Sequence, residues 1–254
     1  MRLTFTPTAH RFVRSVLSGD AREHALCGTR GEGKSWTALD AMIEHALEHG
    51  SRAVQSRDGT RTGRYRLPVP WVSVTDSFEG HKRKLVKSMQ RPEWEGVWRL
   101  SDNLHVGTAV LGEAPLVRVE LFGIEDQGAK SRVRLETCGV HFEEVAPASE
   151  ELEANGVDED SWEVALSSQR VGTYCVCDAC KDPAPMVAED LDAEGFVLGD
   201  SRPICLGCGQ EARRVYPAII TSNYPDEDHW FWKRFKVDPR EGTRLFEIQP
   251  GERV

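Results

Sequence analysis

Eight consecutive residues have the types and spacing of a phosphate-binding loop. They are Gly28, Thr29, Arg30, Gly31, Glu32, Gly33, Lys34 and Ser35, which read G-x-x-x-x-G-K-S. In this pattern the glycines let backbone N–H groups point at a phosphate, the lysine contacts the β- and γ-phosphates, and the serine hydroxyl binds Mg²⁺. The run predicts a site for ATP and Mg²⁺, with Lys34 and Ser35 as its chemical groups.

A strand and a helix are expected on either side of this loop. Residues 23–27 can serve as a buried strand, and residues 34–49 have apolar side chains at a helical period that Gly50 ends. The start of such a helix places its positive end behind a bound anion. Strand, loop and helix in this order favour a nucleotide site over an ordinary glycine-rich turn.

Two adjacent carboxylates follow another predicted strand. Residues 138–142 form that strand, and Glu143 and Glu144 come directly after it. Hydrolysis of ATP needs an acid near Mg²⁺ and a group that orients the attacking water. We predict that Glu143 holds Mg²⁺ together with Ser35, and that Glu144 is the catalytic group that polarises the water. The alternative is the start of an acidic loop, because residues 143–163 contain nine acids and no lysine or arginine.

Hydroxyl and amide side chains lie at the end of a third predicted strand, residues 216–221. They are Thr221, Ser222 and Asn223. Ligands of parallel sheets gather at the carboxyl ends of the strands. We therefore predict that this triplet senses the γ-phosphate and couples its release to movement.

The predicted elements alternate between strands and helices around the phosphate loop. The remaining ones are a strand at 71–75, helices at 77–90, 160–170 and 226–235, and a hairpin from 104–110 and 116–122. This order predicts an α/β fold of the P-loop NTPase class (ASCE or RecA-like), with a mostly parallel sheet flanked by helices. We assign residues 1–254 to this one ATPase domain.

Four of the seven cysteines form two C-x-x-C pairs. They are Cys177, Cys180, Cys205 and Cys208. Two such pairs are typical of a structural zinc site, because each pair supplies one side of a tetrahedron. We predict a small zinc-binding module at residues 172–213, inserted into the ATPase domain, with Cys175 as an alternative ligand to Cys177. The acids between the pairs favour a scaffold over a DNA contact, and Cys27 and Cys138 are expected to be small core residues.

Composition and charge narrow the class of protein. The net charge of −9 argues against a surface coated for nucleic-acid binding. Residues 51–66 nevertheless carry five arginines, and we expect there a mobile basic loop that touches a phosphate backbone or is simply a solvated insertion. The sequence has no apolar stretch long enough to cross a membrane and no secretory signal at its start, which favours the cytoplasm.

The order of these motifs resembles the ATPase domain of large terminases of tailed phages, the motors that pump DNA into empty heads. The segments that carry the resemblance are Phe5-Thr6-Pro7, Arg30 in the phosphate loop, Phe142-Glu143-Glu144, and residues 219–225 with His229, Trp230 and Phe235. Two positions depart from the family pattern. His10-Arg11 stands where a glutamine is usual, and Glu143 stands where an aspartate is usual.

The resemblance implies an ATPase that drives translocation of double-stranded DNA, with Arg30 as an additional catalytic group. It also implies a portal protein and a small terminase as partners, in the cytoplasm of the host cell and without a membrane. A ring of subunits is implied on docking, with a monomer when alone. In a ring, Arg132 or Arg134 is a candidate arginine finger reaching a neighbour's site.

Two other functions remain open from the sequence. One is a different P-loop ATPase, helicase-like, with a zinc insertion. The other is a zinc-stabilised adaptor that binds nucleotide without hydrolysing it. Large terminases normally continue into an RNase H-like nuclease, and no second cluster of acids follows the motifs above, so we expect no nuclease activity from these residues.

Overall fold

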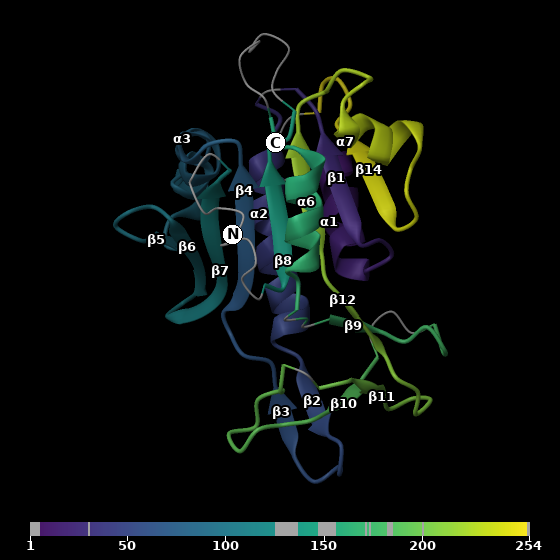
Figure 1. The fold of residues 1–254 in the computed structure, drawn as a ribbon. Coiled ribbons are helices and arrows are strands. Elements are labelled where there is room, and N and C mark those ends of the chain that lie inside the picture. Colours follow the sequence, from purple (N-terminus) through teal and green to yellow (C-terminus); the bar gives the residue numbers. More distant parts are fainter. Residues whose placement is uncertain are drawn as a thin grey trace.

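An eight-stranded sheet organises the molecule (Figure 1). The computed structural model describes residues 6–29, 31–124, 137–146, 156–170, 172, 174–181, 185–199 and 201–252. The strand order is β14-β1-β13-β8-β4-β7-β6-β5. The strands from β14 to β7 run parallel, and β6 and β5 are antiparallel additions at one edge. The predicted α/β fold with a mostly parallel sheet is confirmed.

The strands of this sheet are short. Their bounds are Glu23–Cys27 for β1, Val69–Thr75 for β4, Trp98–Leu100 for β5, Val106–Leu111 for β6, Ala114–Gly123 for β7, Gly139–Glu143 for β8, Ala218–Ser222 for β13 and Thr243–Glu247 for β14. Every residue of β1, β8 and β13 is buried, as expected for central strands covered on both faces.

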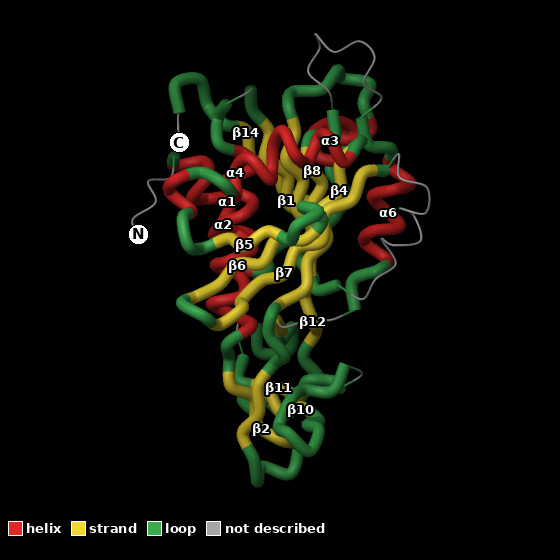
Figure 2. Tube along the Cα trace, turned by 90° about the vertical axis from the view of Figure 1, so that its left-hand side faces the viewer, coloured by secondary structure: helices red, strands yellow, loops and turns green. Residues whose placement is uncertain are grey.

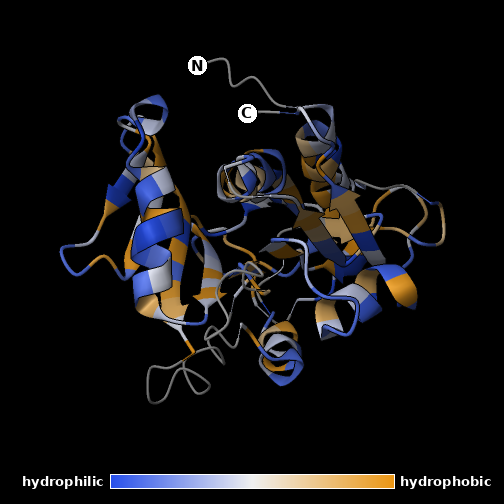
Figure 3. Ribbon diagram, turned by 90° about the horizontal axis from the view of Figure 1, so that it is seen from above, coloured by the Kyte–Doolittle hydropathy of each residue, from blue (hydrophilic) through white to orange (hydrophobic). Residues whose placement is uncertain are grey.

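Helices cover both faces of the sheet (Figure 3). Their bounds are Pro7–Ser18 for α1, Lys34–His45 for α2, Ala46–Gly50 for η1, Phe78–His81 for α3, Lys82–Val86 for η2, Lys87–Met89 for α4, Pro92–Trp94 for η3, Glu159–Ser167 for α6, Trp230–Trp232 for α7 and Lys233–Val237 for η4. One apolar core joins α1, α2 and α4 to one face, and a second joins α6 and α7 to the other. Leu26 of β1 belongs to the first core and Cys27 to the second, because successive strand residues point to opposite faces. None of the helices in the described ranges has both the length and the hydropathy that a membrane span requires.

The elements that position the phosphate loop and the paired acids lie where the sequence predicts them. The hairpin of β6 and β7 is confirmed as well. Among the elements in and around the main sheet, α1, η3, β5 and β14 were not predicted. For α1 the signals were present, since Thr6 accepts a hydrogen bond from the Ala9 N–H at the start of the helix and Pro7 is its first residue. The helix predicted from 226 begins only at Trp230.

The cysteine-containing segment folds with a second, distant part of the chain. Its strands are Ala53–Ser56 for β2, Thr62–Arg64 for β3, Tyr174–Val176 for β9, Val187–Glu189 for β10, Ile204–Cys205 for β11 and Arg213–Val215 for β12. They form a sheet of order β11-β10-β2-β3 and a pair of β12 with β9. We call residues 51–66 and 172–215, within the described ranges, the cysteine module.

The prediction of a mobile basic loop at residues 51–66 was wrong. These residues form the hairpin of β2 and β3, and β2 pairs with β10. Acids of the 187–199 segment offset the charge of two of these arginines. Arg57 lies 2.7 Å from Asp190, and Arg66 pairs with Asp192. Val54 and Tyr65 of the hairpin pack into a small core that also holds Cys175.

The cysteine module lies at the end of the sheet opposite the phosphate loop (Figures 1 and 2). Its two segments connect helices to the amino ends of β4 and β13. The phosphate loop, by contrast, follows the carboxyl end of β1. Parallel strands place these ends on opposite edges, so the module and the predicted ATP site are separated by the length of the strands.

Several histidines are buried within the domain. His24, His45 and His81 have no exposed surface, and burial lowers their pKa to about 4, 3 and 4. His45 packs edge-on against Trp71 with ring centroids 5.8 Å apart. Among the described residues, neither ring nitrogen of His45 has a hydrogen-bond partner. The folded protein therefore holds this ring uncharged.

We expect acid to destabilise the fold through His45. The unfolded chain takes up a proton near pH 6.5, whereas the folded chain does so only near pH 3, so stability is lost as pH falls below 6.5. The contribution of this one group is about 1.4 kcal/mol for each pH unit. Urea unfolding from pH 7.5 to 4.5 should show a shallower loss for His45→Leu than for the wild type. His10→Gln, at an exposed position, is the control, and equal slopes in all three proteins would contradict the prediction.

Candidate nucleotide-binding site and cysteine cluster

The predicted phosphate loop joins β1 to α2 in a compact turn. Gly33 caps α2 with φ of 76°, and Gly31 has φ of 82°, left-handed conformations that favour glycine. The Lys34 ammonium group donates to the carbonyls of Gly28 at 2.9 Å and Thr29 at 2.6 Å. These contacts hold the lysine against the first turn of the loop, at the start of α2, where the helix favours an anion.

Glu143 lies between the loop helix and the third strand. It is the last residue of β8, and its carboxylate accepts from the Ser35 hydroxyl at 2.5 Å and from the Thr221 hydroxyl at 2.8 Å. The register of β8 with β13 places Glu143 beside Thr221. The longer side chain of glutamate, at a position where the family has aspartate, still reaches the serine of the loop.

A buried histidine, which sequence reasoning missed, completes this arrangement. His141 Nδ1 lies 2.9 Å from the Ser73 hydroxyl, and His141 Nε2 lies 3.0 Å from Thr221 Oγ1 and 3.3 Å from a carboxylate oxygen of Glu143. His141 thus lies between the Ser73 hydroxyl on one side and the Thr221 hydroxyl and Glu143 carboxylate on the other. The only signal in the sequence was a histidine two residues before the first acid, inside an apolar strand.

These contacts keep the Glu143 carboxylate ionised. Burial by itself raises its pKa, but the contacts from His141, Ser35 and Thr221 outweigh burial and lower the pKa to about 2. Burial also lowers the pKa of Lys34, although the nearby carboxylate of Glu143 acts against that shift. A fully charged carboxylate beside a hydroxyl is a ligand pair that Mg²⁺ accepts.

Glu144 has a different environment from its neighbour. It has a left-handed backbone with φ of 54°, and its N–H donates to the Thr221 carbonyl at 2.6 Å. Its side chain is 11% exposed, accepts from the Asn223 amide at 2.7 Å and forms an ion pair with Lys84 of η2. The carboxylate is therefore held by one amide and one cation at the edge of the site.

The predicted coupling triplet divides between two faces of β13. Thr221 and Asn223 face the site, and Asn223 bridges it, since its carbonyl oxygen lies 3.3 Å from the Lys34 ammonium group while its amide holds Glu144. Ser222 points to the other face, where its hydroxyl accepts from the Ala146 N–H at 3.1 Å. Alternation along a strand separates these neighbours.

The structure brings together most of the predicted nucleotide-site residues. Ser35 and Thr221 both donate to Glu143, and Asn223 joins Lys34 to Glu144. The Glu144 N–H, which donates to the Thr221 carbonyl, links these two sets of hydrogen bonds. Three predicted arginines lie outside the described residues: Arg30, Arg132 and Arg134. Lys84 was not predicted to be part of the site.

Comparison with solved structures places this architecture among known folds. Two crystal structures of the large terminase from a thermophilic bacteriophage, one in complex with ADP, match with TM-scores of 0.56 and 0.54 at 12% identity. The matches cover 96% and 98% of this chain. The chain has the fold of a phage large terminase. It spans 46% of the length of each terminase chain. No protein-family description matches it, and neither does any curated protein.

The four paired cysteines of this terminase-like fold converge on one point. The sulfur atoms of Cys177, Cys180, Cys205 and Cys208 all lie within 4.8 Å of one another. Cys177 and Cys208 are 3.4 Å apart, and Cys180 and Cys205 are 3.8 Å apart. Four sulfurs at about 2.3 Å from a tetrahedral zinc ion would lie about 3.8 Å apart, so this donor set fits zinc.

The two cysteine turns have the same backbone form. The residue after each pair is left-handed: Lys181 has φ of 57° and Gly209 has φ of 73°. In the first turn, the backbone N–H groups of Cys180 and Ala179 donate to Cys177, and the first of these contacts is the main cause that lowers the pKa of Cys177 to about 7. A thiol that ionises this easily is prepared to bind a metal.

Cys175 does not belong to this cluster. It lies in the small core of the cysteine module, with its sulfur 4.0 Å from the Tyr65 hydroxyl, and burial raises its pKa to about 11. Cys27 and Cys138 are fully buried in the two main cores, which confirms the prediction for them.

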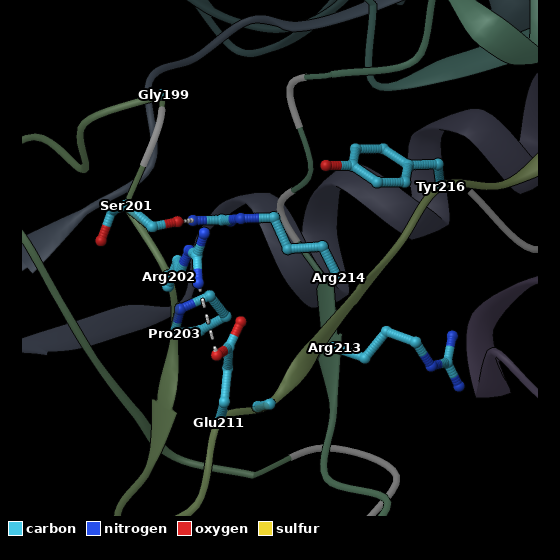
Figure 4. Close-up of a pocket in the computed structure, with 9 residues that line it drawn as sticks. Gly199, Ser201, Arg202, Pro203, Glu211, Arg213, Arg214 and Tyr216 are labelled. Carbon is cyan, nitrogen blue, oxygen red and sulfur yellow. Dashed lines mark hydrogen bonds and ion pairs between the residues drawn. The ribbon is translucent and has the colours of Figure 1, made fainter.

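A pocket of about 550 Å³ lies where the cysteine module joins the domain (Figure 4). Three arginines line it, but each has an acidic partner. Arg214 contacts the buried carboxylate of Glu189, Arg213 pairs with Asp178, and Arg202 lies 4.0 Å from Glu211. Because these charges are matched, the pocket does not present an anion-binding surface.

We expect one zinc ion per chain, held by the four clustered thiolates. Cys205→Ser should abolish stoichiometric zinc, because a hydroxyl replaces one of the four sulfur ligands and a serine does not ionise at neutral pH. Cys175→Ser should retain one equivalent, because that thiol lies outside the cluster. Zinc released by a thiol-blocking reagent and measured with a chelating dye gives both values. Loss of zinc in Cys175→Ser and its retention in Cys205→Ser would reverse the assignment.

Proposed function

We propose that this chain is the ATP-hydrolysing motor domain of a machine that translocates double-stranded DNA, as the resemblance to large terminases implies. One observation carries the proposal. The Ser35 hydroxyl at the start of α2 contacts Glu143, while Asn223 joins Lys34 to Glu144. The phosphate loop and the paired acids are more than 100 residues apart in sequence, and these contacts bring them together at one site.

Each residue of this site has a distinct task in the proposed mechanism. The phosphate loop, residues 28–35, holds the phosphates through its backbone N–H groups, with Lys34 and Arg30 as the cations. Ser35 and Glu143 are the residues that would hold Mg²⁺, which would supply positive charge to offset that of the phosphates. Glu144 orients and polarises the attacking water.

The ion pair with Lys84 bears directly on the role of Glu144. A carboxylate paired with an ammonium group is a weak base, so Glu144 must leave Lys84 before it can accept a proton from water. Asn223 holds the same carboxylate and also Lys34, so it can report the state of the phosphate site to Glu144. Thr221 and Asn223 are thus the coupling residues in this proposal. Ser222 is excluded from this role, because its hydroxyl lies on the other face of the strand and accepts from the Ala146 N–H.

A basic helical face beside the site supports DNA as the partner. Arg83 of η2, Lys87 of α4 and Arg91, which lies two residues after α4, are exposed and follow one another at four-residue spacing. Within the described part of the chain, neither Arg83 nor Lys87 forms a salt bridge, although the protein carries a net charge of −9. Lys84, on the same helix, contacts Glu144. A phosphate backbone on this face would lie one helix away from the catalytic group.

The spacing and clustering of the four cysteines support a structural zinc-binding insertion at residues 172–213 of the single domain, which folds together with the hairpin at 51–66 in the cysteine module. The assembly, by contrast, follows from the family resemblance. The working assembly is a ring docked on a portal protein in the host cytoplasm, with a small terminase. Arg132 or Arg134 is the arginine finger supplied to the neighbouring subunit.

We expect Glu144→Gln to lower ATP turnover about a hundredfold or more, because the amide cannot act as a base. Affinity for ATP should change by less than about threefold, since the phosphate loop is intact. Lys34→Ala should instead weaken ATP binding itself. Steady-state phosphate release and equilibrium binding of a fluorescent ATP analogue measure the two effects, with Glu120→Gln on β7 as the control. Binding without turnover in the wild type would favour a nucleotide-binding adaptor over a motor.

The basic face gives a second test. Arg83→Glu with Lys87→Glu should weaken binding of duplex DNA by at least about tenfold and flatten its salt dependence, because two phosphate contacts are replaced by repulsion. Arg99→Glu, a charge reversal at an exposed arginine paired with Glu113, should leave DNA binding near the wild-type value. Fluorescence anisotropy at several salt concentrations measures this. An equal loss in both proteins would assign the effect to net charge and remove the face from the proposal.

A further inference from the structure

The phosphate loop contains its own anion. The Thr29 N–H donates to the carboxylate of Glu32 at 2.5 Å. A side chain at Gly28 would collide with the same carboxylate oxygen, so this oxygen lies against the first turn of the loop. The carboxylate also lies close enough to Lys34 to influence its charge. Glu32 thus occupies a position among the groups that the proposed function gives to a phosphate.

A carboxylate and a phosphate compete for such a position. Both are anions that accept from backbone N–H groups, and both are favoured by the positive end of α2. The Thr29 N–H can make one strong hydrogen bond at a time. Because Glu32 is part of the loop, its local concentration at this N–H is high and does not depend on solution conditions. Nucleotide must therefore displace Glu32 before the loop can close on its phosphates.

We infer that Glu32 is a built-in competitor that weakens nucleotide binding and speeds release of the product ADP. The inference rests on the proposed function, because it concerns the same site. When the diphosphate begins to leave, the carboxylate returns to the Thr29 N–H and blocks recapture. Product release limits the turnover of many enzymes, so a group that speeds it acts on the cycle time of the motor.

The test compares nucleotide binding by wild type, Glu32→Gln and Glu32→Ala. Removing a charge-assisted hydrogen bond should tighten binding of ADP about tenfold in Glu32→Ala, mainly through slower dissociation. Inorganic pyrophosphate should gain similarly, because the competition concerns phosphate and not the base. Glu32→Gln keeps the size of the side chain and should show a smaller gain. The probes are a fluorescent ADP analogue followed by stopped flow, and its displacement by pyrophosphate.

Glu44→Gln is the matched control. Glu44 is an exposed carboxylate in the last turn of α2, so this variant removes one negative charge but leaves the phosphate loop unchanged, and its affinity should stay within about twofold of wild type. If the wild type binds ADP and neither Glu32 variant binds it more tightly, the inference is overturned, but the proposed function still stands. An equal gain in Glu44→Gln assigns the effect to overall charge and also overturns it. Failure of every protein to bind nucleotide overturns both proposals.

Discussion

The burial of one carboxylate sets the geometry of the whole site. Glu143 is 4% exposed, and an unpaired carboxylate at such a position would cost several kcal/mol. The cost is offset because hydroxyls from α2 and β13 and an imidazole of β8 all contact it. Those contacts exist only if β8 and β13 keep their register and α2 begins at the loop. The charge of Glu143 therefore ties the phosphate loop to the strand order.

The direction of the strands in the main sheet also determines where the cysteine module lies. Its two segments leave and re-enter the domain at the amino ends of β4 and β13, whereas the site occupies the carboxyl ends. Segments more than 100 residues apart can fold together there because β4 and β13 both flank β8. The module has its own small core and its own candidate metal ligands. It can therefore be stabilised without any strain on the residues of the candidate nucleotide site.

Local sequence patterns predicted the motif residues of the site. They missed the residues whose role depends on contacts between elements that are distant in sequence. The phosphate loop and the adjacent acids were predictable because spacing along the chain determines their chemistry. His141 and Lys84 were not, since each gains its role from a partner on another element: His141 from Ser73 and Thr221, Lys84 from Glu144. The arginines of residues 51–66 suggested a mobile loop for the same reason. Their acidic partners lie more than 120 residues later in the chain.

The different surroundings of the two adjacent glutamates separate their roles. Glu143 is enclosed by donors from rigid elements, so its charge is fixed and it suits a metal ion. Glu144 has a left-handed backbone and lies at the rim, where its partners are Lys84 and the Asn223 amide, which also contacts Lys34. Neither partner is a residue of the sheet. The proposed mechanism requires Glu144 to exchange partners, and the rim suits this task, because rearranging a buried network would cost more than exchanging a partly exposed ion pair.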